Sequence, residues 1–150
     1  MNYVIEKLKP QDYHKCNNIW DMAKQPNTEK WLEEIKSGSR VVFVYIIDGK
    51  FIGERAIVFE NGDPDYTISK QRVYLSRLIV KKEYRNQGIG SIIINYLVDY
   101  VKAMGYKEFS VGVDLDNTGA RRLYDRHGFT QVIFEGKDEY GKYVKLLKTL

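Results

Sequence analysis

The feature that most constrains the fold is a segment in which an extended apolar run leads through a glycine-containing turn into a long apolar helix. Residues 72–80 are rich in aliphatic side chains, which is typical of a buried strand. Residues 88–104 carry apolar side chains at helical spacing, and Gly105 follows as a helix-ending residue. Such a helix has to bury much of its surface, so the segment indicates a helix packed on a sheet.

The rest of the chain offers strands and helices in an order that fits one mixed α/β layer. Asp48 and Gly49 are a strong tight-turn signal between two apolar runs, so residues 40–47 and 51–60 should pair as antiparallel neighbours. With no repeat, linker or break in composition, we expect residues 1–150 to form a single domain. The expected strands are residues 3–9, 40–47, 51–60, 72–80, 109–115, 129–134 and 140–147, and the expected helices are residues 10–24, 28–37, 88–104 and 118–127.

Charge and composition exclude several classes of function. The chain has 24 Lys and Arg against 20 Asp and Glu, and this charge is spread along the sequence, so we find no basic stripe for nucleic acid. Cys16 is the only cysteine and lies on an apolar stripe of the first helix, where core packing is its expected role. Neither it nor His14 and His127 has metal-ligand spacing, which predicts no metal. No stretch approaches a membrane span or a signal peptide, so we expect no membrane partner and a cytoplasmic location.

Arg85, Gly88 and Gly90 form the pattern R-x-x-G-x-G at the entrance of the long helix. A helix N-terminus presents unpaired N–H groups and the positive end of the helix dipole, and glycines let a phosphate approach the backbone. Taken alone, the pattern fits either close packing or a phosphate site. It is not a P-loop, because no Lys followed by Ser or Thr comes after the glycines. Ile93 occupies the third glycine position of a dinucleotide-binding motif.

This pattern resembles the signature of the GNAT N-acetyltransferases, which carry R/Q-x-x-G-x-G/A directly after a strand and before a helix. Family members are also similar to this chain further along, where a strand ends in Asn, a helix carries a Tyr, and a Gly-Phe pair closes that helix. Those residues are Asn117, Tyr124, Gly128 and Phe129. The specific motifs cover residues 73–134, and the order of the elements extends the resemblance loosely over the rest. Asn86 departs from the Gly that many relatives carry, a change that the backbone tolerates.

The resemblance implies the GNAT fold, a single and mostly antiparallel central sheet of about seven strands, splayed at the cofactor site, with about four helices. It implies acetyl-CoA as cosubstrate. The pantetheine arm would pair with the backbone at the end of the strand 72–80, as an added strand does, and the backbone N–H groups of residues 85–90 would bind the pyrophosphate. Asn117 would hydrogen-bond the arm, cap the following helix, or do both. The implied cofactor-binding residues are Leu78, Ile79, Val80, Arg85, Asn86, Gln87, Gly88, Ile89, Gly90, Ser91, Asn117, Tyr124 and Arg126.

Tyr124 is the residue expected to act in catalysis, because a phenol beside a leaving thiolate can donate a proton or a hydrogen bond. The alternative for Tyr124 is an aromatic ring that covers the helix interface. The base that deprotonates the amine is open. Glu54 is a candidate if Ile52, Glu54 and Ala56 share one face of their strand, and its alternative is a solvated or salt-bridged carboxylate. Residues 71–76 lack the glutamate that many relatives carry there, so we expect no direct base at that strand.

Together these features predict an N-acetyltransferase that moves an acetyl group directly from acetyl-CoA to a primary amine in a ternary complex, since nothing suggests an acyl-enzyme. We expect a small-molecule acceptor, and the alternatives are a protein amine or a non-catalytic coenzyme A binding module. The acceptor pocket should come from the first sixty residues, whose aromatic side chains line it or form core: Tyr13, Trp20, Trp31, Phe43 and Tyr45. The last strands could support a homodimer, unless Lys142, Lys145 and Lys148 guard that edge.

Overall fold

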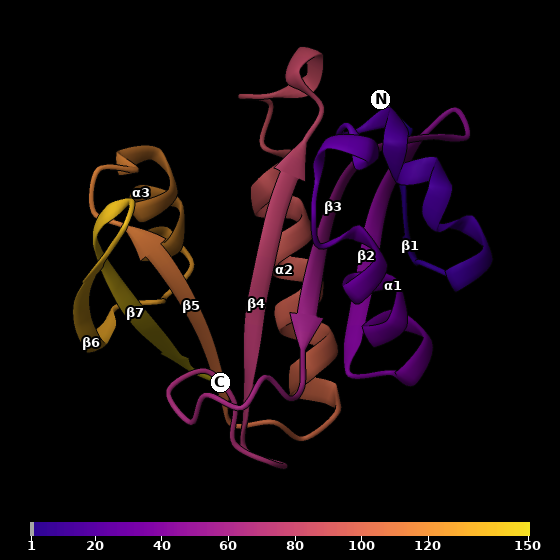
Figure 1. The fold of residues 1–150 in the computed structure, drawn as a ribbon. Helices are drawn as coiled ribbons and strands as arrows, with labels where there is room; N and C mark the ends of the chain where they lie inside the picture. The colour runs from indigo at the N-terminus through magenta and orange to yellow at the C-terminus, as the bar shows by residue number, and fades with distance from the viewer. Residues whose placement is uncertain (1) are drawn as a thin grey trace. The chain divides into compact units, whose positions relative to one another are not determined.

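The computed structural model describes residues 2–150 and contains seven strands, three α-helices and three 3-10 helices (Figure 1). The strands form one open sheet in the order β1-β2-β3-β4-β5-β7-β6, which confirms the expected mixed α/β fold. None of the described helices is both long and apolar enough to cross a bilayer. In chain order the elements are β1 (Val4–Lys7), the 3-10 helices η1 (Pro10–Asn18) and η2 (Met22–Lys24), α1 (Thr28–Ser37), β2 (Arg40–Ile47), β3 (Lys50–Val58), β4 (Arg72–Val80), the 3-10 helix η3 (Lys82–Tyr84), α2 (Ile89–Ala103), β5 (Glu108–Asp114), α3 (Thr118–Arg126), β6 (Gln131–Asp138) and β7 (Gly141–Thr149).

The chain divides into two compact units, which we call the first unit and the second unit. The first unit comprises the described residues up to Ile57 together with Arg77–Ile94. The second unit comprises Val58–Ser76 and Asn95–Leu150. Strand β4 passes from the second unit into the first, and helix α2 passes from the first into the second.

The first unit builds its core between the sheet, η1 and α1. Strand β1 pairs antiparallel with β2 from Val4 to Lys7, and α1 contacts both β2 and η1. Asp48 and Gly49 have φ angles of 50° and 76°, the left-handed pair that a tight two-residue hairpin turn requires, so the turn expected here is confirmed. The buried core cluster consists of Leu8, Tyr13, Cys16, Ile19, Ile35, Val42, Val44, Ile46, Phe51 and Ala56.

The segment 10–24 differs from the single helix expected for it. It forms the 3-10 helix η1, an interruption around Trp20, and the three-residue η2. The apolar residues that define the helix, Tyr13, Cys16 and Ile19, follow one another at intervals of three. This spacing places them on one face of a helix with three residues per turn as well as on an α-helix. Their burial was therefore predicted correctly, and Cys16 is fully buried, but the type of helix was not.

The second unit is built around β7, which lies between β5 and β6. Strand β5 pairs antiparallel with β7 along its whole length, from Glu108 to Asp114, and β6 pairs antiparallel with β7 on the other side. The parallel ladder between β4 and β5 is short by comparison. It joins Arg72–Tyr74 to Glu108–Ser110, and both strands continue beyond it.

Candidate active site

The turn that leads into α2 contains two residues with left-handed backbone conformation. Asn86 has a φ of 63° and Gly88 a φ of 83°. Gly adopts this conformation without strain, and Asn is one of the few other residues that adopt it readily. Helix α2 begins directly afterwards at Ile89, and residues 85–88 are exposed. The turn itself is thus accessible, and a turn that leads into a helix N-terminus can hold a phosphate group.

Arg85 connects this turn to the end of β4. Its Nε donates a hydrogen bond of 2.9 Å to the carbonyl oxygen of Val80. The backbone N–H of Lys81, one residue later, donates to the carbonyl of Ile52 at 2.8 Å. Gly53 on β3 lies against the same strand end, since a Cβ atom there would stand 3.4 Å from the carbonyl oxygen of Ile79, at ordinary contact distance. Leu78, Ile79 and Val80 are each half-buried, in a strand end that neighbouring groups hold in place.

Arg77 interrupts β4 with a left-handed conformation, at a φ of 43°. A residue with a Cβ seldom adopts this conformation inside a strand, so the local backbone is strained and must be held by its surroundings. The guanidinium carbon lies 4.0 Å from the ring centroid of Trp31 and 4.7 Å from that of Trp20. Two cation–π contacts of this kind stabilise the arginine in a half-buried position. Desolvation nevertheless lowers the pKa of Arg77, while the negative charge of Glu54 raises it.

Glu54 is enclosed by donors from η1 and the residues that follow it. One oxygen accepts a hydrogen bond from the indole N–H of Trp20, and the other accepts one from the Cys16 thiol at 3.9 Å. Only 5% of Glu54 is exposed, so the alternative of a solvated carboxylate is wrong. Burial raises the pKa of Glu54, and the hydrogen bond from Trp20 and the charges of Arg77 and Arg40 lower it. The cavity beside Glu54 measures about 10 Å³, roughly the space of one water molecule.

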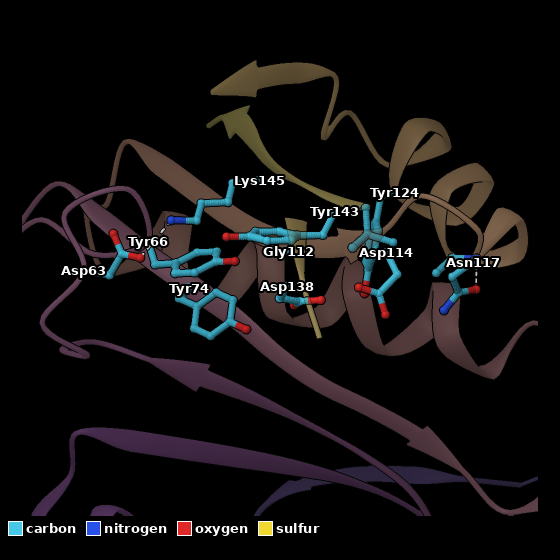
Figure 2. Close-up of a pocket in the computed structure, with 12 residues that line it drawn as sticks. Asp63, Tyr66, Tyr74, Gly112, Asp114, Asn117, Tyr124, Asp138, Tyr143 and Lys145 are labelled. Atoms are coloured by element: carbon cyan, nitrogen blue, oxygen red, sulfur yellow. Dashed lines mark hydrogen bonds and ion pairs between the residues drawn. The ribbon is translucent and has the colours of Figure 1, made fainter. Parts of the chain in front are cut away.

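The second unit contains a much larger pocket, of about 440 Å³, at the junction of β5 and α3 (Figure 2). Tyr124 lines it from α3, is 7% exposed, and meets the ring of Phe129 edge-on at 5.8 Å between centroids. Asn117 lines it from the start of α3, where its Oδ1 accepts a hydrogen bond of 3.1 Å from the N–H of Ala120. The N-cap alternative for Asn117 is therefore confirmed, and this contact uses only the oxygen of its amide.

Three tyrosine rings form the wall of this pocket away from α3 (Figure 2). The rings of Tyr66 and Tyr74 lie 4.3 Å apart between centroids, and Tyr143 lies on β7. A Cβ atom at Gly112 would overlap the hydroxyl oxygen of Tyr66, so only glycine at this position of β5 leaves room for that ring. Burial raises the pKa of Tyr66, as do its tyrosine and aspartate neighbours, and Tyr66 remains a neutral phenol at physiological pH.

Lys145 lies on β7 against the same wall, in a position that contradicts one expectation from the sequence. Its Nζ binds Asp63 at 2.9 Å and Asp65 at 3.0 Å, and it stands 4.8 Å from the ring centroid of Tyr66. Lys145 is 7% exposed, and β7 lies inside the sheet. The alternative that Lys142, Lys145 and Lys148 guard a strand edge is therefore wrong, since all three lie on β7. Instead Lys145 fixes the segment before β4, which carries both aspartates, to the interior of the second unit.

The structure brings some of the predicted site residues together. Asn117 and Tyr124 line one pocket in the second unit, and Arg126 is exposed in the last turn of α3. The implied cofactor residues of the turn and helix start, from Arg85 to Ser91, adjoin one another in the first unit. Tyr13, Trp20 and Trp31 line the small cavity beside Glu54, whereas Phe43 and Tyr45 are buried strand residues. Sequence reasoning missed a further set of pocket residues, which lie far apart along the chain and share no local pattern: Tyr66, Tyr74, Asp114, Asp138, Tyr143 and Lys145.

The family model described as "Acetyltransferase (GNAT) family" matches residues 3–129 of the chain. Among curated proteins, the chain is similar to N-alpha-acetyltransferase MAK3 of Arabidopsis thaliana, with 32% identity over 90 residues, which is 60% of this chain and 45% of that protein. It is also similar to thialysine N-epsilon-acetyltransferase of Sus scrofa, with 36% identity over 80 residues, which is 47% of each chain. The matched region spans less than half the length of these curated relatives.

A likeness to solved structures extends over nearly the whole chain. The ribosomal-protein-S18-alanine N-acetyltransferase from Escherichia coli superposes with a TM-score of 0.79, covering 99% of this chain and 94% of that one. The two sequences are 17% identical, so this likeness concerns the fold alone.

Proposed function

Because the chain belongs to the GNAT acetyltransferase family, we propose that it is an enzyme that transfers an acetyl group from acetyl-CoA to a primary amine. The transfer is direct, in a ternary complex of enzyme, acetyl-CoA and amine. Residues 1–150 act as one domain in this proposal, and the protein works in the cytoplasm. A homodimer through the last strands stays a prediction from the sequence.

The observation that carries the proposal is the position of Tyr124, which lines a pocket of about 440 Å³. A pocket of this size is typical of small-molecule sites. Tyr124 carries a phenolic O–H group, which can donate a proton or a hydrogen bond to a developing thiolate. Asn117 lines the same pocket, and its amide NH₂ group is available to a ligand while its oxygen caps α3. Both residues therefore fit the roles that the family resemblance implies.

The turn before α2 fits the phosphate end of acetyl-CoA. Its left-handed residues Asn86 and Gly88 and the first N–H groups of α2 offer donors to a pyrophosphate, and Arg85 holds the turn to Val80. Strand β4 continues from Leu75 to Val80 beyond its ladder with β5. In the proposal, the backbone of Leu78, Ile79 and Val80 pairs with the pantetheine arm, as an added strand would.

The proposed reaction conserves atoms and protons. The amine nitrogen attacks the acetyl carbon, the carbon–sulfur bond breaks, and Tyr124 protonates the departing sulfur to give free coenzyme A. A base accepts the proton that the amine loses, and solvent returns a proton to Tyr124. Glu54 is the proposed base, acting directly or through water. Its raised pKa supports this role, because a base works best when its pKa lies near the operating pH.

We propose a small-molecule acceptor in preference to a protein amine. The pocket volume supports this choice, and the acidic and aromatic wall of the pocket is suited to a small cation. The similar proteins include one named for an N-alpha-amine and one named for the epsilon-amine of an amino acid, so both kinds of acceptor belong in the test.

The test measures release of the coenzyme A thiol from acetyl-CoA over a panel of small amines and short peptides. We expect turnover with at least one small amine, and a fall in kcat of about 100-fold or more in Tyr124→Phe, because a general acid is lost. Binding of coenzyme A to Tyr124→Phe should be nearly unchanged. The matched control is Tyr140→Phe, which removes the same hydroxyl from a tyrosine that is 77% exposed.

A second variant, Gly88→Glu, separates binding from chemistry. It places a side chain on a left-handed residue and a negative charge beside the proposed phosphate site, so coenzyme A binding should be lost. Tight coenzyme A binding by the intact protein without turnover of any amine would overturn the enzymatic proposal in favour of a binding module. The variant Glu54→Gln tests the proposed base. If Glu54 is the base, the fall of kcat at acidic pH should disappear in this variant while KM stays unchanged.

A further inference from the structure

The pocket around Tyr124 is negatively charged, although the chain as a whole has a net charge of +4. Its charged lining residues are three aspartates and one lysine, a net charge of minus two. Asp63 is one of the three and is already bound to Lys145, which in turn also binds Asp65. The two remaining carboxylates, Asp114 and Asp138, take part in no ion pair among residues 2–150. They are the charges that a ligand can neutralise.

The sheet brings Asp114 and Asp138 to Tyr143. Asp114 on β5 is the register partner of Tyr143 on β7, and register partners present their side chains on the same face of a sheet. Asp138 ends β6, at the hairpin that leads into β7, and one of its oxygens accepts the backbone N–H of Tyr140 at 2.9 Å. This bond fixes the carboxylate while its second oxygen can accept from a ligand. Figure 2 shows Asp138 and Asp114 in the pocket lining along with the Tyr143 ring.

The aromatic wall of this pocket already holds one ammonium group. The Nζ of Lys145 stands 4.8 Å from the ring centroid of Tyr66 and 4.5 Å from that of Phe134, within the range of a cation–π contact. The same wall continues through Tyr74 and Tyr143, which also line the pocket. Tyrosine rings together with carboxylates are a chemical environment for alkylammonium groups.

We propose that the acceptor is an alkyl diamine or polyamine, and that Asp114, Asp138 and the ring of Tyr143 bind its second ammonium group. This inference rests on the proposed function, because it names the acceptor of the same pocket. The amine to be acetylated is directed toward Tyr124, and the distant ammonium stays charged and selects the substrate. A monoamine of the same length makes none of the charged contacts and is therefore a poor acceptor.

The first experiment compares matched amines in the coenzyme A release assay. The pairs are 1,4-diaminobutane with butylamine and 1,5-diaminopentane with pentylamine. A tripeptide whose side chains are uncharged represents a protein amine. One charge-assisted hydrogen bond contributes about 1.5–3 kcal/mol, so each diamine should exceed its monoamine in kcat/KM by about tenfold to a hundredfold. Equal values within a pair, or a higher value for the tripeptide than for both diamines, would overturn the inference.

The variants Asp114→Asn and Asp138→Asn, alone and together, test the assigned residues. Each should lower kcat/KM about tenfold more for the diamine than for the monoamine, so that the double variant loses the preference. Asp99→Asn is the control, because Asp99 is exposed on α2 and outside the pocket lining. A diamine preference that persists in the double variant contradicts the assignment.

Binding of 1,4-diaminobutane by titration calorimetry separates the two proposals, because it requires no turnover. Turnover of monoamines and diamines at equal rates, with no calorimetric binding, overturns the inference and leaves the proposed function standing. If the parent protein binds the diamine, the double variant does not, and no amine is turned over, the result supports the cation site and overturns the proposed function. Folding of each variant is checked by its thermal midpoint, and both aspartates are exposed, so we expect midpoints close to that of the parent protein.

Discussion

Each unit of the molecule contains carboxylates beside aromatic rings, yet one cluster is closed and the other is open. In the first unit, Glu54 has hydrogen-bond donors on both oxygens and a cavity of about 10 Å³ beside it. In the second unit, Asp114 and Asp138 are exposed in a pocket of about 440 Å³. The residue types are alike. What differs is how far the protein itself supplies the partners of the carboxylate: both oxygens of Glu54 have a side-chain donor, whereas Asp138 accepts one backbone N–H.

Glu54 in the first unit and Asp63 in the second also respond to pH in opposite directions. Burial raises the pKa of Glu54, so its ionisation opposes folding. The hydrogen bond from Lys145 lowers the pKa of Asp63, so its ionisation favours folding. As the pH rises, ionisation of Glu54 therefore destabilises the protein, and ionisation of Asp63 stabilises it. Three measurements test these differences between the two units.

The largest expected effect concerns Cys16, the only cysteine of the chain. It is fully buried, and burial together with the charge of Glu54 raises the pKa of its thiol. We expect a thiol reagent to react with the native protein on the order of 1,000 times more slowly than with the protein unfolded in urea, since reaction requires opening of the core. Glutathione under both conditions corrects for the effect of urea on the reagent. Rapid native labelling would show that the first cluster is not closed.

A smaller effect is expected for Lys145→Met, which leaves Asp63 and Asp65 without their cation. Buried ion pairs lose several kcal/mol when one partner is removed, but both aspartates here are more than a third exposed, so we expect about 2 kcal/mol in the free energy of unfolding. The lowered pKa of Asp63 means that this stabilisation is present above its ordinary pKa of 3.8 and is lost as the pH falls through its lower folded value.

Urea unfolding at pH 7 and below pH 3 measures this difference, which should narrow at the lower pH. Lys142→Met on the same strand is the matched control, because Lys142 is exposed. A loss in Lys145→Met no larger than that in Lys142→Met would mean that the lysine does not hold the segment with Asp63 and Asp65.

The smallest expected effect is the pH dependence that Glu54 contributes. A carboxyl group whose pKa is raised in the folded protein contributes its full stabilisation below its ordinary pKa of 4.5. This contribution is lost as the pH rises through the pKa of the folded state. The slope for one proton is at most about 1.4 kcal/mol per pH unit. Glu54→Gln should remove this slope above pH 4.5, measured as the change in unfolding free energy with pH. Glu6→Gln, an exposed residue on β1, should retain the slope of the parent protein.

Much of the fold could be predicted from local patterns. Strands β2 and β4 have the bounds expected from their apolar runs, and the Asp48–Gly49 turn follows from two residues that tolerate left-handed conformation. Strand β6 was expected over residues 129–134 but runs from Gln131 to Asp138. Residues 135–138 are polar and mostly exposed, so pairing with β7 holds them in the strand without any apolar pattern to reveal it.

The candidate site could be predicted only where its residues follow one another in the chain. The turn with Asn86 and Gly88 is local, and its geometry agrees with its sequence. By contrast, Lys145 lies 82 residues from Asp63, and no local pattern distinguishes it from the exposed Lys142. The left-handed Arg77 is also hidden, because an arginine in an apolar run carries no turn signal. Tertiary contacts determine these positions, and one sequence does not display them.

The place of β7 has a consequence for synthesis of the protein on the ribosome. Strand β7 is made after both of its neighbours, and β6 pairs with it and not with β5. Until residues 141–149 have emerged, the nascent chain therefore exposes the β5 edge that carries Phe109, Val111 and Val113. At about 5–20 residues per second, the chain from β5 to the end of β7 takes a few seconds to make. During this interval an unpaired apolar strand is open to other nascent chains and to chaperones, and it closes only when the last strand is inserted.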